Sequence, residues 1–178
     1  HKFKQNKSIF YSNGGITDVV LSFYTSIFDN IDFFARIEKS DNVSNMSSVT
    51  NDNVLLFDGF RNQKSLIEKI KENNCIILRL PSMLGELAAF CARRNNKLYL
   101  VEMVGCPWDS YWNHSFKGKI VAPIMWFLTR LATKNASYVA YVSESFLQKR
   151  YPTNGKILAC SDVQIKKTSE SVLNERLE

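Results

Sequence analysis

A loop rich in acidic and aromatic residues follows a short apolar run in the middle of the chain. Residues 98–101 read Leu-Tyr-Leu-Val, which is typical of a buried parallel strand, and Gly105 and Pro107 punctuate the segment after it. Ligands of open α/β sheets bind beyond the carboxyl ends of the strands, so this loop is a candidate site. A loop that only packs over the sheet edge is the alternative. The side chains that could do chemistry there are Glu102, Trp108, Asp109, Tyr111, Trp112 and His114.

These residue types suit a carbohydrate ligand. Glu102 and Asp109 can act as acid, base or hydrogen-bond acceptor for sugar hydroxyls, and His114 can donate a proton or bind a phosphate oxygen. The flat apolar faces of Trp108 and Trp112 can pack on the C–H face of a sugar. The alternative for His114 is that it is an exposed loop residue with no catalytic role.

Two other segments could contribute to the same site. Residues 79–82, Arg-Leu-Pro-Ser, stand between a predicted strand and a predicted helix. Unpaired N–H groups at a helix start attract anions and hydroxyls, so Arg79 and Ser82 are candidates; a capped helix with an exposed arginine is the alternative. Gly14 and Gly15 precede the first predicted helix, where glycine lets a ligand approach the backbone. The chain contains neither Gly-x-Gly-x-x-Gly nor a Walker motif, which disfavours dinucleotide and NTP binding.

Strands and helices alternate along the chain, and this alternation must position the candidate residues. It predicts an α/β fold, a Rossmann-like domain whose mostly parallel sheet is covered by helices on both faces. A strand should precede the first helix, supplied either by residues 8–11 or by chain upstream of residue 1; the short length of residues 8–11 favours the second. Residues 40–53 are expected to form a surface loop. Strands are predicted at residues 31–36, 54–57, 75–78, 98–101, 138–142 and 157–160.

Helices are predicted from apolar residues that recur at helical spacing. The first should bury Val20, Phe23, Tyr24 and Ile27, and the second should begin at a capping box formed by Ser65 and Glu68. Ser82 can cap a third helix that buries Leu84, Leu87, Ala88 and Cys91. A fourth, residues 122–135, should turn Ile124, Phe127, Leu128 and Leu131 inward. Its other face carries Trp126, Arg130 and Lys134, for which contact with an anionic membrane surface and simple solvation are the two alternatives.

Composition sets the broad class of the protein. With 178 residues, 45% of them apolar and 22% charged, the chain fits one globular domain or half of a two-domain enzyme. The net charge is +6, but the basic residues are dispersed and no nucleic-acid-binding motif is present, so nucleic acid is not an expected partner. No stretch reaches the roughly 18 apolar residues that a membrane span requires.

The cysteines are scattered along the chain without a Cys-x-x-Cys pair. Cys75 and Cys91 fall in apolar patterns and are expected to be small buried hydrophobic residues, which favours a reducing compartment. With only His1 and His114 as histidines, a zinc site is not expected.

The carboxyl-terminal third resembles a known enzyme family. Residues 141–153, Tyr-Val-Ser-Glu-Ser-Phe-Leu-Gln-Lys-Arg-Tyr-Pro-Thr, and residues 160–163 are similar to the amino-terminal domain of bacterial group 1 (family 4) glycosyltransferases, which are retaining enzymes of GT-B architecture. Residues 79–82, 101–109 and 117–119 look like strand-end loops of the same family. The resemblance extends over most of residues 10–165. The chain departs from the family pattern in two ways. Its first strand is missing or short, and the second domain, which binds the nucleotide sugar in this family, is absent.

The resemblance implies an acceptor-binding half-enzyme. The full protein would be a hexosyltransferase-type enzyme that moves a sugar from a nucleotide sugar to a glycan or lipid-linked acceptor with retention of configuration, in polysaccharide biosynthesis. No metal or other cofactor is implied, because this family is generally not metal-dependent; the nucleotide-sugar donor would bind mainly to the absent carboxyl-terminal domain. A cytoplasmic location is implied, either free in the cytoplasm or in peripheral contact with the inner face of the membrane. The cleft would be lined by Gly14, Gly15, Arg79, Ser82, residues 102–114, Ser143 and Glu144.

The same resemblance suggests roles and domain limits. Asp109 and Glu102 would bind acceptor hydroxyls, Trp108 or Trp112 a sugar face, and Arg79 or His114 the donor phosphates. Residues 1–165 would form the acceptor-side domain and residues 166–178 the start of a linker, with Leu177 and Glu178 as possible tag residues. A fragment of this kind should be inactive alone. The rival hypothesis is a non-catalytic Rossmann-like module that binds a ligand or partner; a nicotinamide-dependent oxidoreductase is disfavoured by the missing glycine fingerprint.

Overall fold

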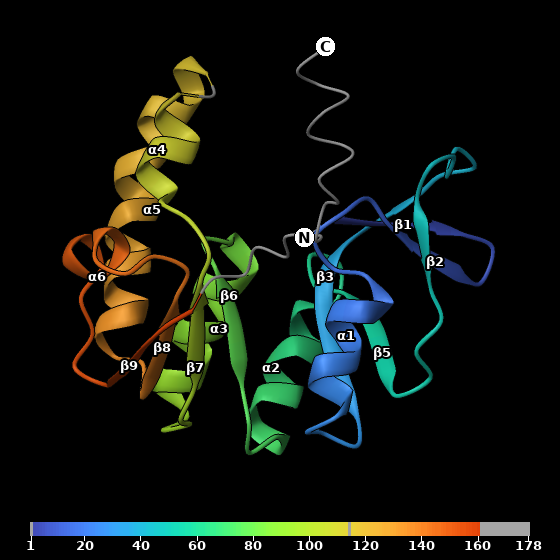
Figure 1. Ribbon diagram of the computed structural model, residues 1–178, viewed down its shortest axis with the longest axis horizontal. Coiled ribbons are helices and arrows are strands. Elements are labelled where there is room, and N and C mark those ends of the chain that lie inside the picture. Colours follow the sequence, from blue (N-terminus) through green and yellow to red (C-terminus); the bar gives the residue numbers. More distant parts are fainter. Residues whose placement is uncertain (1, 114, 161–178) are drawn as a thin grey trace, which may run out of the picture.

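The computed structural model describes residues 2–113 and 115–160, so His1, His114 and the predicted linker lie outside the described residues. Strands and helices alternate as predicted, and Figure 1 shows their arrangement. The strands are β1 (Lys2–Asn6), β2 (Ile9–Ser12), β3 (Ile31–Lys39), β4 (Ser47–Val49), β5 (Val54–Asp58), β6 (Ile77–Leu80), β7 (Leu100–Met103), β8 (Tyr138–Tyr141) and β9 (Lys156–Ala159). The helices are α1 (Asp18–Thr25), α2 (Gln63–Glu72), α3 (Met83–Arg94), α4 (Pro107–Trp112), α5 (Phe116–Lys134) and α6 (Phe146–Arg150).

The carboxyl-terminal half contains a fully parallel sheet. Its strands follow the order β6-β7-β8-β9, and each is joined to the next by at least one helix. The central strands read as apolar runs, and Val101, Met103, Val139 and Tyr141 are almost completely buried. Parallel strands have this composition because helices cover both faces of the sheet. The register places Arg79 beside Glu102, so the carboxyl ends of β6 and β7 lie level.

The amino-terminal half forms a second, mixed sheet in the order β4-β2-β1-β3-β5. Strands β1, β3 and β5 are parallel, whereas β2 pairs antiparallel with both β1 and β4. A separate apolar cluster supports this sheet, with Phe3, Ile16 and Leu21 completely or almost completely buried. The predicted α/β, Rossmann-like class with mostly parallel strands is confirmed. The strands are divided between two sheets, however, where the sequence predicted one.

Several local predictions were wrong or incomplete. Residues 2–12 form the β1–β2 hairpin, so a strand at Ile9–Ser12 does precede α1, although it is antiparallel to its neighbours, and strand β4 lies inside the predicted surface loop. The predicted loop after β7 contains α4, which Pro107 can start because proline fits the first helical turn. Helix α2 begins after Asn62, so Ser65 lies in its first turn and forms no capping box. Cys75 is exposed, whereas Cys91 is buried as predicted.

Helix α5 turns a different face inward from the one predicted. Ile124, Phe127 and Leu128 are 55%, 59% and 37% exposed. The buried face consists mainly of small side chains, which allow α5 to pack closely against α3 and α4. Apolar residues lie on both faces of this helix, so periodicity alone could not select the buried one. The residues that are buried are Gly118, Ala122, Met125, Thr129, Ala132 and Thr133.

The first helix shows the same kind of error. Leu21 is the buried residue of α1, whereas Phe23 and Ile27 are exposed. Within the described part of the chain, no helix combines the length and apolar character that crossing a membrane requires.

A buried carboxyl group joins α3 to α5. Glu86 is 8% exposed and accepts a hydrogen bond from the fully buried hydroxyl of Thr129. Burial raises the pKa of Glu86 to about 7, and the hydrogen bond from Thr129 opposes this rise only in part. The folded protein therefore holds this proton far more tightly than the unfolded chain, where the pKa is about 4.3.

This difference predicts a pH-dependent stability. Because the folded pKa is raised, the contribution of Glu86 is fully present below pH ~4 and is lost as the pH rises through 7, on the order of 3 kcal/mol in total. We expect Glu86→Gln to flatten the fall in the free energy of unfolding between pH 5 and pH 8. Urea denaturation at pH 5 and at pH 8 measures the free energy of unfolding of each variant, and Glu144→Gln, which changes an exposed carboxylate, is the control. An unchanged pH slope in the Glu86 variant would contradict the assignment.

Candidate functional site

A polar cluster lies at the carboxyl ends of β6 and β7. Arg79 of β6 and Glu102 of β7 form an ion pair, with Nη1 3.1 Å from Oε2. The phenol of Tyr24, from α1, donates a hydrogen bond of 2.5 Å to Oε1 of the same carboxylate. Both oxygens of Glu102 are therefore held by groups from different elements. The structure thus brings together Arg79 and Glu102, two of the residues predicted to line one cleft, in a pair that the sequence did not predict.

The environment of the cluster fixes the protonation of the phenol. The pKa of Tyr24 is raised well above its usual value, mainly by burial and further by the hydrogen bond to the Glu102 carboxylate. Tyr24 therefore remains a hydrogen-bond donor at physiological pH. The side chains of Arg79 and Glu102 are 24% and 20% exposed, so solvent reaches them but does not separate them. A carboxylate has about four acceptor positions, so Glu102 can accept further hydrogen bonds from a ligand.

The cluster forms one wall of a cavity. The cavity, of about 280 Å³, is bounded by α1, β3, α2, β6 and α3, and Tyr24, Arg79 and Glu102 all line it. Most of the remaining wall is apolar. The three polar groups converge at one end of the cavity, where a ligand could contact them.

Ser82 lines the same cavity but has a structural partner. Its hydroxyl accepts a hydrogen bond of 3.0 Å from the backbone N–H of Gly85 and so caps α3. The predicted cap is confirmed. A ligand hydroxyl at this point would have to share the Ser82 oxygen with the cap.

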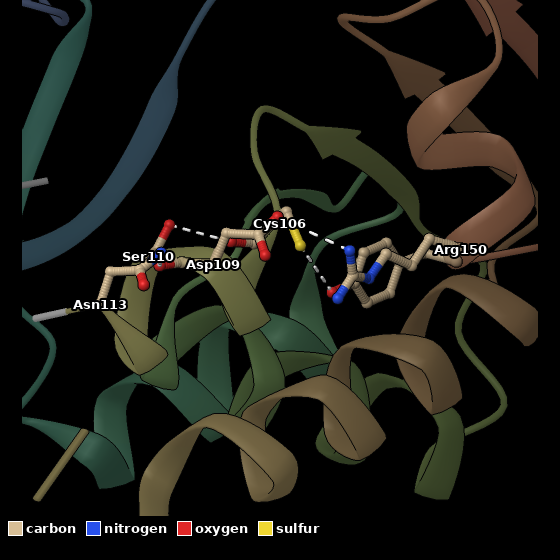
Figure 2. Close-up of polar contacts among 6 residues, drawn as sticks. Cys106, Asp109, Ser110, Asn113 and Arg150 are labelled. Carbon is tan, nitrogen blue, oxygen red and sulfur yellow. Dashed lines mark hydrogen bonds and ion pairs between the residues drawn. The ribbon is translucent and has the colours of Figure 1, made fainter. Parts of the chain in front are cut away.

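Asp109 lies in the first turn of α4, away from the contacts of Glu102. Figure 2 shows its carboxylate facing Arg150 of α6, with the closest nitrogen–oxygen pair 3.6 Å apart. The Asp109 side chain is 50% exposed, which leaves an oxygen accessible to a ligand. Two side chains of this region hydrogen-bond to the backbone of α4 four residues earlier. The hydroxyl of Ser110 donates to the carbonyl of Cys106, and the amide of Asn113 donates to the carbonyl of Asp109.

The two tryptophans of α4 stack on each other. The rings of Trp108 and Trp112 are 5.0 Å apart and 13° from parallel, because residues four apart lie on one side of a helix. Trp108 packs against the core, whereas Trp112 is 39% exposed. The ammonium of Lys119 lies 5.8 Å from the Trp112 ring centre. Of the two predicted sugar platforms, Trp112 is the more accessible.

The other predicted site residues lie in exposed or capping positions. Gly14 has φ +106°, a conformation that favours glycine, and both Gly14 and Gly15 are exposed before α1. Ser143 Oγ accepts from the N–H of Leu147 at the start of α6. Glu144 is exposed. The role predicted for His114 lies outside the described residues.

Sequence reasoning missed three residues that organise this region. Tyr24 was assigned to an apolar stripe, although its phenol completes the Glu102 cluster. Arg150 and Tyr151 lay within a motif but were given no role. Cys106 Sγ lies 3.2 Å from the buried Tyr151 hydroxyl, and Tyr141 donates to the Tyr151 carbonyl. The first contact joins the end of α6 to the loop after β7, and the second joins it to β8; neither has a local sequence signal.

Among the residues that the structure describes, no group of three or more His, Cys, Asp or Glu side chains could hold a metal ion.

A curated protein is similar in sequence to most of this chain. Protein CapJ of Staphylococcus aureus is 36% identical over 169 residues, a match that includes 87% of the chain. The chain spans 42% of the length of that relative. No family model and no solved structure matches the chain.

Proposed function

We propose that this chain is the acceptor-binding half of a retaining glycosyltransferase of GT-B architecture that acts in polysaccharide biosynthesis. The observation that carries the proposal is the Tyr24–Arg79–Glu102 cluster at the strand ends of a Rossmann-like domain. The resemblance of residues 141–153 to the family supports it. So does the greater length of Protein CapJ, which leaves room for a second domain in a protein of that size.

The cluster has the chemistry that such an enzyme needs on its acceptor side. Glu102 is oriented by Arg79 and Tyr24, so its free acceptor positions can align a sugar hydroxyl for transfer. Arg79 also lies at the strand ends, where a sugar diphosphate from the facing domain would bind, and the Glu102 carboxylate balances its charge in the unliganded protein. The residues of this half bind and orient the acceptor, and the facing domain supplies the nucleotide sugar.

The class of reaction can be tested directly. Full-length protein would be incubated with a panel of nucleotide sugars and short glycan or lipid-linked acceptors, and product formation followed by NMR. We expect transfer with the anomeric configuration of the donor retained. Inversion would contradict the retaining class. Ligand binding without any turnover would favour the rival, a non-catalytic Rossmann-like module.

Trp112 should act as an acceptor platform. We expect Trp112→Ala to raise the KM for the acceptor about tenfold in the full-length enzyme and to leave kcat nearly unchanged, because it removes a binding surface present before and during reaction. Steady-state kinetics with varied acceptor measures the change. The exposed Phe90→Ala, on α3, is the control. An unchanged KM would exclude Trp112 from the acceptor site.

Helix α5 supports the proposal of peripheral membrane contact, through a face other than the one first considered. Phe116, Ile120 and Phe127 are 80%, 62% and 59% exposed, and a helix of 3.6 residues per turn places them on one stripe. Lys117 lies to one side of this stripe, and Lys119 and Arg130 lie to the other. An exposed apolar stripe flanked by basic residues fits an anionic lipid surface. Such contact would bring the domain to a lipid-linked acceptor.

Vesicle binding tests this contact. We expect the double variant Ile120→Ser, Phe127→Ser to bind at least tenfold more weakly to vesicles with anionic lipid, since each side chain loses its apolar burial in the bilayer. Co-sedimentation measures it, and Leu98→Ser, also an exposed apolar residue, is the control. Equal binding of the variant and the parent protein would contradict the assignment of this face.

A further inference from the structure

Two strand edges face each other across the cavity. On one side lies β3, with residues 31–34 in the wall, and on the other lies β6, with residues 76–79 in the wall. No ladder joins β3 to β6 among the described residues. Helix α1 and the pair α2 and α3 provide the other walls. The cavity thus has strands at two sides and helices at the others, which is the environment of a strand in a doubly wound sheet.

The backbone groups at both edges point into this space. In a parallel ladder alternate residues bond the same neighbour, and Ile31 and Ala35 bond toward β5, so Asp32 and Phe34 direct their N–H and C=O groups to the other side. On the other side, Ile76, just before β6, and Leu80, at its end, accept bonds from the β7 segment, so Ile77 faces the cavity. Backbone groups that become buried need hydrogen-bond partners, and a strand in this space would supply them.

The side chains that line the middle of the cavity are apolar, and an ion pair lies at each end of it. Lys69 and Asp32 form an ion pair near the amino end of β3, and Arg79 and Glu102 near the carboxyl end of β6. Between them the wall is formed by Leu21, Phe28, Leu66, Ile70, Leu84 and Ala88.

The register of β1 indicates what fills the space. Strand β1 is parallel to β3 and pairs with its second half, with Lys2 beside Arg36. On this side of β3, the first half, Ile31–Ala35, has no described partner; its known ladder is with β5 on the opposite side. Continuing the β1 register backwards therefore brings the positions upstream of Lys2 alongside that first half. In Figure 1, β1 begins at the upper end of β3.

We propose that the chain leading into Lys2 in the full-length protein forms a β-strand in this space, parallel to both β3 and β6. The two sheets then become one, in the order β5-β3-new strand-β6-β7-β8-β9. The occupant must be a largely apolar run of about five residues, because helices cover both of its faces. The order of strands reverses between the new strand and β6, so this junction is the topological switch point where ligands of such sheets bind. Arg79 lies at that junction.

Hydrogen exchange of single amides tests the proposal. Full-length protein, with its natural residues ahead of Lys2, would be compared with the same protein truncated to begin at residue 1. We expect the amides of Phe34 and Ile77 to exchange at least 10²-fold more slowly in the longer protein. The amides of Phe33 and Leu78, which bond to β5 and β7, are matched controls and should be protected in both.

The outcomes distinguish the possible occupants. Slow exchange of Phe34 and Ile77 only in the longer protein supports the proposal. Equal, fast exchange in both proteins would overturn it and leave the space as a ligand cavity. Slow exchange in the truncated protein, accompanied by dimers in light scattering, would overturn it in favour of a second copy of the chain. Since none of these results depends on sugar transfer, they are independent of the proposed activity.

Discussion

Replacing Glu102 by glutamine is expected to lower kcat/KM of the full-length enzyme about 10²-fold, the usual cost of removing one preorganised electrostatic group from an active site. Glutamine keeps the size of the side chain but removes its charge, so both the ion pair with Arg79 and the acceptor for the Tyr24 phenol are weakened. An acceptor hydroxyl would then lose the group that orients it. Steady-state kinetics with varied acceptor measures the loss.

Two controls separate a role in reaction from a role in folding. Glu68→Gln changes an exposed carboxylate on α2 and should leave kcat/KM within twofold. Thermal unfolding of Glu102→Gln reports the structural cost of the broken ion pair. Normal turnover in a folded Glu102→Gln protein would remove Glu102 from the site and with it the main support for the proposed function.

Replacing Gly118 by alanine is expected to destabilise the fold by about 3 kcal/mol, at the upper end of overpacking effects. A Cβ at Gly118 would stand 2.0 Å from the backbone oxygen of Tyr111, at the end of α4. Backbone atoms cannot move aside as a flexible side chain does, so α4 and α5 would have to separate. The N–H of Gly118 is also fixed, because it donates 3.1 Å to the capping hydroxyl of Ser115.

Thermal denaturation measures this effect. A loss of about 3 kcal/mol corresponds to a fall in Tm of roughly 6–12 °C for a domain of this size. Gly105→Ala is the matched control, since the nearest atom to its new Cβ, in Pro81, is 4.0 Å away. A fall in Tm no larger than that of the control would show that α4 and α5 can separate at little cost.

Much of the architecture follows from local sequence. Strand β5 and strand β8 lie within one residue of their predicted limits, because short apolar runs between turn residues have few other solutions. The cap at Ser82 was predictable for the same reason, since its partner is the N–H of Gly85, three residues away. The meeting of Arg79 and Glu102 was also accessible, since both end parallel strands that are neighbours in sequence.

Tertiary structure decided the rest. Tyr24 reaches Glu102 across 78 residues of chain, and nothing near Tyr24 in sequence distinguishes it from a core aromatic residue. The buried face of α5 depends on how closely α4 approaches, and the contact at Gly118 sets that approach. Asp109 and Arg150 pair only because α6 folds back beside α4. Local sequence indicated where most strands and helices form, since that depends largely on neighbours along the chain, but it missed β1, β4 and α4. Which side chains meet depended on long-range packing.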